Sequence, residues 1–190
     1  MANTNAPFGL KPVRHAAGGE LMTNDYPIAV GYTTAIYKGD LVKMANDGTI
    51  TASAAANADN LGVFWGCSYK DPTGAKVFSN YWPGTASCTD IVAHVYDDPN
   101  IIFAIQSDAT GFAAADVGQL VDIEYVAGST LTGVSKVNAD VSAGTATTNM
   151  TLRLLRLVDD GINTAGAYSI GEVIIIEHVM RPNVAGLGGI

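Results

Sequence analysis

The sequence predicts an all-β fold: a single β-barrel or β-sandwich-like domain with an extended N-terminal arm, a short C-terminal tail and at most one or two short helices. Short runs rich in β-branched and aromatic residues recur along most of the chain, as is typical of strands. Gly, Pro, Asn and Asp separate these runs and signal tight turns. Hydrophobic residues make up 48% of the 190 residues, which is enough for one domain with a packed core and argues against disorder.

Residues 1–25 are expected to form the extended arm, because they are rich in Asn, Ala, Gly and Pro and show no sustained periodicity. Pro7 and Pro12 favour extended backbone around them. The apolar anchors that would dock this arm into a groove on a neighbour are Phe8, Leu10 and Val13. The alternative is a terminus that folds over its own domain.

Residues 26–180 are expected to form the β-rich core domain. Near its start, Lys38-Gly39-Asp40 and Asn46-Asp47-Gly48 mark corners between short strands, since Gly tolerates positive φ. Residues 61–82 predict a hairpin about the turn "DPTGAK". Residues 89–107 predict two more strands about "DDPN".

The second half of the chain is less regular. Residues 108–118, "DATGFAAADVG", are the best local helix candidate, but only for a turn or two. The run "TLRLLRLVDDG" (151–161) is ambiguous, because its leucines fit helical spacing and share no strict strand alternation. A strand is favoured there, since Thr precedes the run and Asp-Asp-Gly ends it. Residues 171–180 predict a last strand, and residues 181–190 a flexible Gly-rich tail.

The charge of the chain is low and acidic. Charged residues make up 15% of the chain, and the net charge is −8 from 10 basic and 18 acidic residues. So little charge favours burial of part of the surface against partners; the alternative is a neutral surface of Ala, Gly, Ser and Thr. The basic residues are scattered along the sequence, so neither nucleic acid nor an anionic membrane is expected as a partner.

Targeting and redox signals are weak. The first twenty residues lack the apolar segment of a signal peptide, and the late run "VIIIEHVM" is too short to span a bilayer. Cys67 and Cys88 are expected to be free thiols, because nothing indicates an oxidising compartment. A disulfide between them remains the alternative.

The sequence offers no recognisable catalytic set. His15, His94 and His178 lack the close spacing of metal ligands, so no metal site is expected. The patterns of a serine nucleophile elbow, a phosphate-binding P-loop and a dinucleotide fingerprint are absent from the sequence. No pair of carboxylates can be nominated for glycoside hydrolysis. We therefore expect neither enzymatic activity nor a cofactor.

Aromatic residues gather in the segment 65–82. Trp65, Tyr81 and Trp82 could line a sugar-binding face or a subunit interface. Aromatic residues on paired strands more often form core and cross-strand contacts. Core or subunit-interface packing is therefore favoured over a ligand platform.

Four stretches together resemble a known family: "NAPFGLKPVRHAAGGE", "YPIAVGYTTAIYKGDLVKMANDGTI", "LGVFWGCSYKD" and "YDDPNIIFAIQ". The chain, through about Tyr125, is similar to the capsid decoration (cement) proteins of tailed bacteriophages. The resemblance implies a β-rich virion protein, made in the bacterial cytoplasm, that sits on the outer capsid surface. It implies contact with the major capsid protein, homo-oligomers that are often trimers, and stabilisation of the expanded shell, with no catalysis and no cofactor.

Other function classes stay open at this point. A tail-tube, head-completion or fibre-associated subunit would also be β-rich and low in charge. A carbohydrate-binding module would use Trp65, Tyr81 or Trp82 as its platform. An enzyme is the least favoured class, because the sequence shows no triad, carboxylate dyad or metal cluster.

Overall fold

The computed structural model describes residues 3–53, 59–142 and 150–181. Within these ranges the chain forms twelve strands and one short 3-10 helix, so the all-β prediction is confirmed. The helix, η1, lies inside the segment 108–118 where the sequence predicted it. The elements are β1 (Lys11–His15), β2 (Asn24–Pro27), β3 (Leu41–Met44), β4 (Ile50–Ala52), β5 (Asn60–Lys70), β6 (Lys76–Ser79), β7 (Thr89–Tyr96), β8 (Ile101–Gln106), η1 (Ala114–Asp116), β9 (Leu120–Glu124), β10 (Asn138–Asp140), β11 (Leu152–Leu157) and β12 (Ile170–Ile175).

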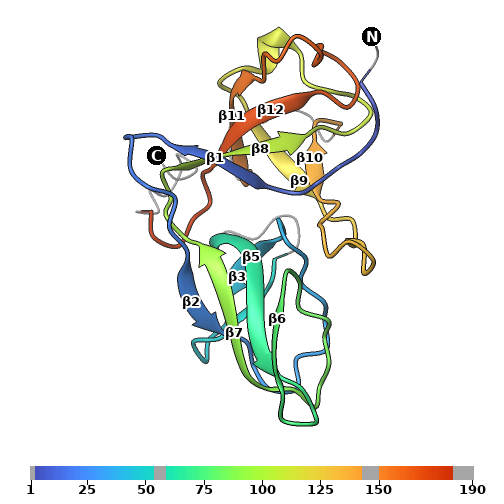
Figure 1. Ribbon diagram of the computed structural model, residues 1–190. Coiled ribbons are helices and arrows are strands. Elements are labelled where there is room, and N and C mark those ends of the chain that lie inside the picture. Colours follow the sequence, from blue (N-terminus) through green and yellow to red (C-terminus); the bar gives the residue numbers. More distant parts are fainter. Residues whose placement is uncertain (1–2, 54–58, 143–149, 182–190) are drawn as a thin grey trace.

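The strands form two antiparallel sheets that pack together as a β-sandwich-like domain (Figure 1). The first sheet has the strand order β1-β8-β12-β11-β9-β10. The second has the order β2-β7-β5-β3-β4, and β6 pairs with β5. The hairpin predicted for residues 61–82 is the β5–β6 pair, and its turn is closed by the Asp71 side chain, whose Oδ1 accepts the Thr73 N–H at 2.9 Å.

The first sheet curls towards a barrel at one corner. In strand order β10 lies at its far edge, yet Ser107, just after β8, forms a parallel bridge with Ala139 of β10. The Asp108 N–H also donates to the Ala139 carbonyl at 2.9 Å. The end of β8 therefore meets both β12 and β10, and the core of this sheet is enclosed on several sides.

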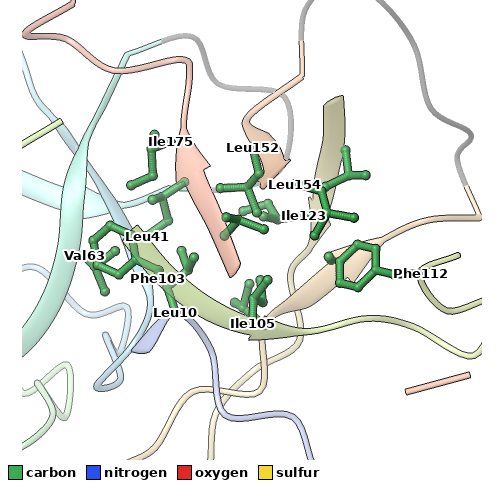
Figure 2. Close-up of a cluster of buried hydrophobic side chains, with 14 of the residues drawn as sticks. Leu10, Leu41, Val63, Phe103, Ile105, Phe112, Ile123, Leu152, Leu154 and Ile175 are labelled. Atoms are coloured by element: carbon green, nitrogen blue, oxygen red, sulfur yellow. The ribbon is translucent and has the colours of Figure 1, made fainter. Parts of the chain in front are cut away.

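A hydrophobic core lies inside this curl (Figure 2). Phe103 of β8 and Leu154 of β11 point into it and are at most 1% exposed. Leu41 of β3 and Val63 of β5 come from the second sheet and join the same cluster. Because this core takes side chains from both sheets, it fixes one sheet against the other.

A second core belongs to the second sheet alone. Trp82 is a large member of it, has no exposed surface and packs edge-on against Tyr69 with ring centroids 5.3 Å apart. The Trp82 indole N–H donates to the Tyr32 carbonyl at 3.2 Å, which satisfies its one polar group. Cys67 and Cys88 are free thiols buried in this cluster, as the sequence predicted.

The N-terminal segment differs from the expected arm. Residues 1–25 were expected to lie outside the core, but they supply β1 to the first sheet and the start of β2 to the second. Leu10 explains the difference: its side chain is fully buried in the first core, and its N–H donates to the Gly39 carbonyl at 2.9 Å. The segment folds onto its own domain. Residues 182–190 of the predicted tail lie outside the described residues.

The strand favoured for the ambiguous run 151–161 is present as β11. Leu152 and Leu154 point into the first core, whereas Arg153 between them points outward. The register against β12 shifts between Leu154 and Arg156, which is a β-bulge. The bulge explains why Leu157 still packs against the core although it breaks strict alternation.

Candidate functional site

The outer face of the first sheet, opposite its core, carries a row of cross-strand neighbours. Lys11 of β1 pairs with Ala104 of β8, Ala104 with Glu172 of β12, and Glu172 with Arg156 of β11. Directly paired residues of antiparallel strands lie on the same face. The register therefore places two cations and one carboxylate in a line across four strands, with the small Ala104 among them.

A groove opens over this row, and we call it the β1 groove. It encloses about 600 Å³, and the methyl group of Ala104 leaves room at its floor. Its walls come from the N-terminal segment, from β8 and β12, and from the residue that follows β11. The lining residues are Phe8, Lys11, Pro12, Val13, Ala104, Val158, Ile170 and Glu172. The groove is thus mainly apolar, with charge at defined points.

Glu172 is buried under two arginines. Its Oε1 accepts a hydrogen bond from Arg156 Nη2 at 2.6 Å, and its Oε2 accepts one from Arg14 Nη2 at 2.9 Å. These bonds, that from Arg156 above all, lower the pKa of Glu172 despite its burial. The Arg14 and Arg156 side chains remain 45% and 61% exposed. The carboxylate therefore holds both guanidinium groups at the groove while leaving much of each open to solvent.

Basic side chains gather on this face although they are scattered in the sequence. Arg14 is paired with Ile102, which is paired with Ile174, which is paired with Arg153. With Lys11 and Arg156, four of the chain's ten basic residues share the outer face of one sheet. The same face also carries Glu172 and, on β9 and β10, Asp122, Glu124 and Asp140, so the excess of positive charge is confined to the part of the face near β1 and β11. No sequence motif predicts this grouping of basic residues, because only the strand register brings them together.

The three anchors proposed for the arm separate into two groups. Phe8 and Val13 line the β1 groove, and Val13 is 44% exposed. Leu10 faces the opposite way and is fully buried in the first core. Phe8 and Val13 can therefore contact a neighbour, whereas Leu10 attaches the segment to its own domain.

The three candidate interface aromatics do not form one surface. Trp65 is partly buried, with Lys38 Nζ 4.0 Å from its ring centroid and Tyr96 edge-on to it. Tyr81 stacks on Tyr37 with ring centroids 5.7 Å apart. Trp82 is fully buried and cannot reach a partner or a glycan. Each ring packs against another part of the chain, and Trp82 has no surface left for a subunit interface.

Large apolar side chains protrude elsewhere. Leu131 is 94% exposed in the loop between β9 and β10, and Phe78 is 75% exposed on β6. Their segments are joined, since Asn80 Nδ2 donates to the Thr132 carbonyl at 2.9 Å. We call Phe78 and Leu131 the apolar tip. Two such side chains on joined segments are a candidate contact surface.

The histidines take part in separate pairs. The His15 ring lies 3.0 Å from an Asp98 carboxylate oxygen, and the His94 ring 2.6 Å from one of Asp25. Burial lowers the pKa of His178 to about 4. Among the described residues, no group of three or more His, Cys, Asp or Glu side chains could hold a metal ion.

The chain is therefore an all-β protein with two distinctive surface features. One is the β1 groove, which is mainly apolar and has basic side chains beside it, and the other is the apolar tip. No protein family model and no curated protein sequence matches the chain. In the part of the chain that the structure describes, no helix is both long and apolar enough to cross a membrane.

Proposed function

We propose that the chain is a virion structural protein of the capsid decoration type. It binds the outer capsid surface and stabilises the expanded shell by bridging capsid subunits, and it associates with itself as a homo-oligomer. The observation that carries the proposal is the exposure of large apolar side chains at the apolar tip of a protein with only 15% charged residues. The resemblance of the sequence to decoration proteins supports the same role.

The physical mechanism is avidity. Strand β6 holds the backbone at Phe78, and the hydrogen bond from Asn80 to the Thr132 carbonyl holds the loop beside Leu131. Little backbone entropy is therefore lost when the two side chains become buried. Each contact is weak on its own. Repeated around a symmetric oligomer on a symmetric shell, such contacts become effectively intramolecular after the first has formed. The capsid is the partner for the apolar tip, and no chemical step is required.

The first experiment is the copy number of the protein in purified virus particles, by quantitative mass spectrometry against the major shell protein. A copy number close to that of the shell protein is expected. A much smaller number contradicts decoration and points to a tail-tube, head-completion or fibre-associated subunit. Absence of the protein from particles contradicts every virion role and leaves a carbohydrate-binding module as the alternative.

The second experiment tests the apolar tip. The double variant Phe78→Asp with Leu131→Asp should fold normally, because both side chains are exposed, and should lose binding to particles that lack the protein. Val117→Asp is the matched control, since Val117 is 45% exposed beside η1. If the double variant binds particles as well as the wild type does, the apolar tip is not the capsid-binding surface. Deleting residues 2–14 is a poor test, because it removes the buried Leu10 and most of β1.

A further inference from the structure

The loop between β11 and β12 presents an exposed apolar side chain just after two acidic residues. Ile162 is 70% exposed, and Asp159 and Asp160 precede it and are also exposed. The Asp160 carboxylate shapes the loop, since its Oδ1 accepts the N–H groups of Ile162 at 2.9 Å and Asn163 at 2.7 Å. The loop thus displays one isoleucine beside two negative charges.

The loop is held in this shape from its base. Asn163 Nδ2 donates to the carbonyls of Val158 at 2.8 Å and Ile170 at 2.9 Å. Asn163 Oδ1 accepts the N–H of Ile170 at 2.9 Å. One side chain therefore ties together the two strands of the loop. Because the loop is ordered in advance, burying its tip costs little conformational entropy.

The same loop borders the β1 groove. Val158 and Ile170, which form its base, also line the groove. The groove supplies what the loop tip lacks: apolar walls, with Lys11, Arg14 and Arg156 at or beside its rim. Ile162 does not fill the groove of its own chain, since most of its surface is exposed. Loop and groove are complementary in polarity and charge, and they lie side by side.

We propose that the β1 groove is occupied by the Ile162 loop of a second copy of this chain. Ile162 enters the apolar hollow over Ala104, and Asp159 approaches Lys11 and the exposed parts of the arginines. Since loop and groove are adjacent, one two-fold axis lets each copy fill the groove of the other. The inference rests on the proposed homo-oligomeric role and names its self-contact; the apolar tip remains free for the shell.

Two other occupants fit the groove less well. A foreign strand added to the edge of β1 would meet Pro12, which has no N–H, and the register shift between Pro12 and Arg14. A nucleic acid would be attracted to the arginines, but the walls of the groove are apolar and Glu172 lies in its floor. An acidic, apolar protein loop matches both features.

The first test is sedimentation equilibrium of the purified full chain without any capsid. A reversible monomer–dimer equilibrium is expected for the wild type. Ile162→Ser should raise the dissociation constant at least about tenfold, because the isoleucine of each copy leaves an apolar pocket. Leu131→Ser is the matched control, an exposed leucine on another loop, and should leave the dissociation constant unchanged.

The second test exchanges charges. Asp159→Lys and Lys11→Glu should each weaken the dimer about three- to tenfold, and the double variant should return it to within about twofold of wild type. Both residues are exposed, so urea unfolding should show unchanged folding stability. Raising the salt concentration should weaken the wild-type dimer.

The outcomes separate this inference from the proposed function. A dimer indifferent to Ile162→Ser and to both charge reversals overturns the loop-in-groove contact and leaves the proposed function intact. A wild-type protein that stays monomeric overturns both this contact and the proposed self-association, and leaves capsid binding to be decided by the copy number in particles. A trimer that Ile162→Ser dissolves overturns the two-fold symmetry. A wild-type protein that stays monomeric and binds a labelled single-stranded oligonucleotide at physiological salt would show that the groove takes a polyanion and not a second copy. Absence of the protein from virus particles refutes the decoration role but does not bear on the contact between loop and groove.

Discussion

Asp40 and His178 are buried titratable groups whose effects on stability have opposite pH dependence. Burial raises the pKa of Asp40 from 3.8 to about 6, and burial lowers the pKa of His178 from 6.5 to about 4. Each pKa change is about two units or slightly more, and one unit corresponds to about 1.4 kcal/mol. Burying the charged form of either group therefore lowers the free energy of unfolding by about 3 kcal/mol. Both act over the same range, about pH 4 to 6.5.

The signs follow from which state of the chain binds the proton. Between pH 4 and 6 the folded state keeps the Asp40 proton that the unfolded chain has released, so this contribution to the free energy of unfolding falls as the pH rises. Below pH 6.5 the unfolded chain protonates His178 while the folded state does not, so that contribution falls as the pH drops towards 4. In the wild type the two contributions largely cancel.

Asp40→Asn breaks this balance. An Asn amide keeps an oxygen for the Tyr37 N–H, which Asp40 Oδ2 accepts at 2.8 Å. The free energy of unfolding should then exceed that of the wild type by about 3 kcal/mol at pH 7, less the cost of burying the amide N–H groups, and the difference should vanish near pH 4. Urea unfolding at four pH values, followed by tryptophan fluorescence, measures it.

The control is Asp47→Asn, in the exposed turn between β3 and β4. Hydrogen bonds from Thr49 lower the pKa of Asp47, so this substitution should give no gain at neutral pH. His178→Gln should show the opposite profile to Asp40→Asn, with stability that falls as the pH rises through 6. A difference between Asp40→Asn and wild type that does not change with pH would refute the reasoning.

Two further predictions concern packing. Gly111→Ala should cost at least about 3 kcal/mol of stability in urea unfolding, because a Cβ would lie 1.8 Å from the Gly166 carbonyl oxygen at a φ of +79°. Gly118→Ala, with similar φ and open space, should cost only about 1–2 kcal/mol, and equal costs would contradict the clash. Cys67 and Cys88 are each 2% exposed, and burial raises the pKa of Cys67 to about 12. Both thiols should therefore resist a disulfide reagent at pH 8 until urea unfolds the chain; rapid native labelling would contradict this burial.

The sequence was most informative where local chemistry decides the structure. Asn46-Asp47-Gly48 correctly predicted the turn between β3 and β4, and "DPTGAK" the turn between β5 and β6. Local signals could not show that β7 and β8, separated only by "DDPN", belong to different sheets. That choice depends on which distant strand each one pairs with, and no short motif encodes it.

The candidate site was only partly predictable for the same reason. Phe8 and Val13 were recognisable as apolar anchors in an irregular segment, but their neighbour Leu10 could not be distinguished from them without knowing which side of β1 faces the core. Lys11 and Glu172 lie at opposite ends of the sequence and meet only through the register of β1, β8 and β12. A weak signal existed in "RLLRLV", where arginines interrupt a leucine-rich strand.

The pairing of β1 with β8 gives the chain a modular plan. His15 is opposite Ile101, and the Ala16 N–H donates to the Asn100 carbonyl at 2.9 Å. The chain therefore leaves the first sheet and returns to it at a single point, and the whole second sheet is an insertion into a hairpin. Leu41 and Val63 reach back from the insert into the core of the host, and Tyr96 of β7 packs against that core. Such a plan lets the insert change its outer loops while the host keeps its groove, provided that these contacts stay apolar.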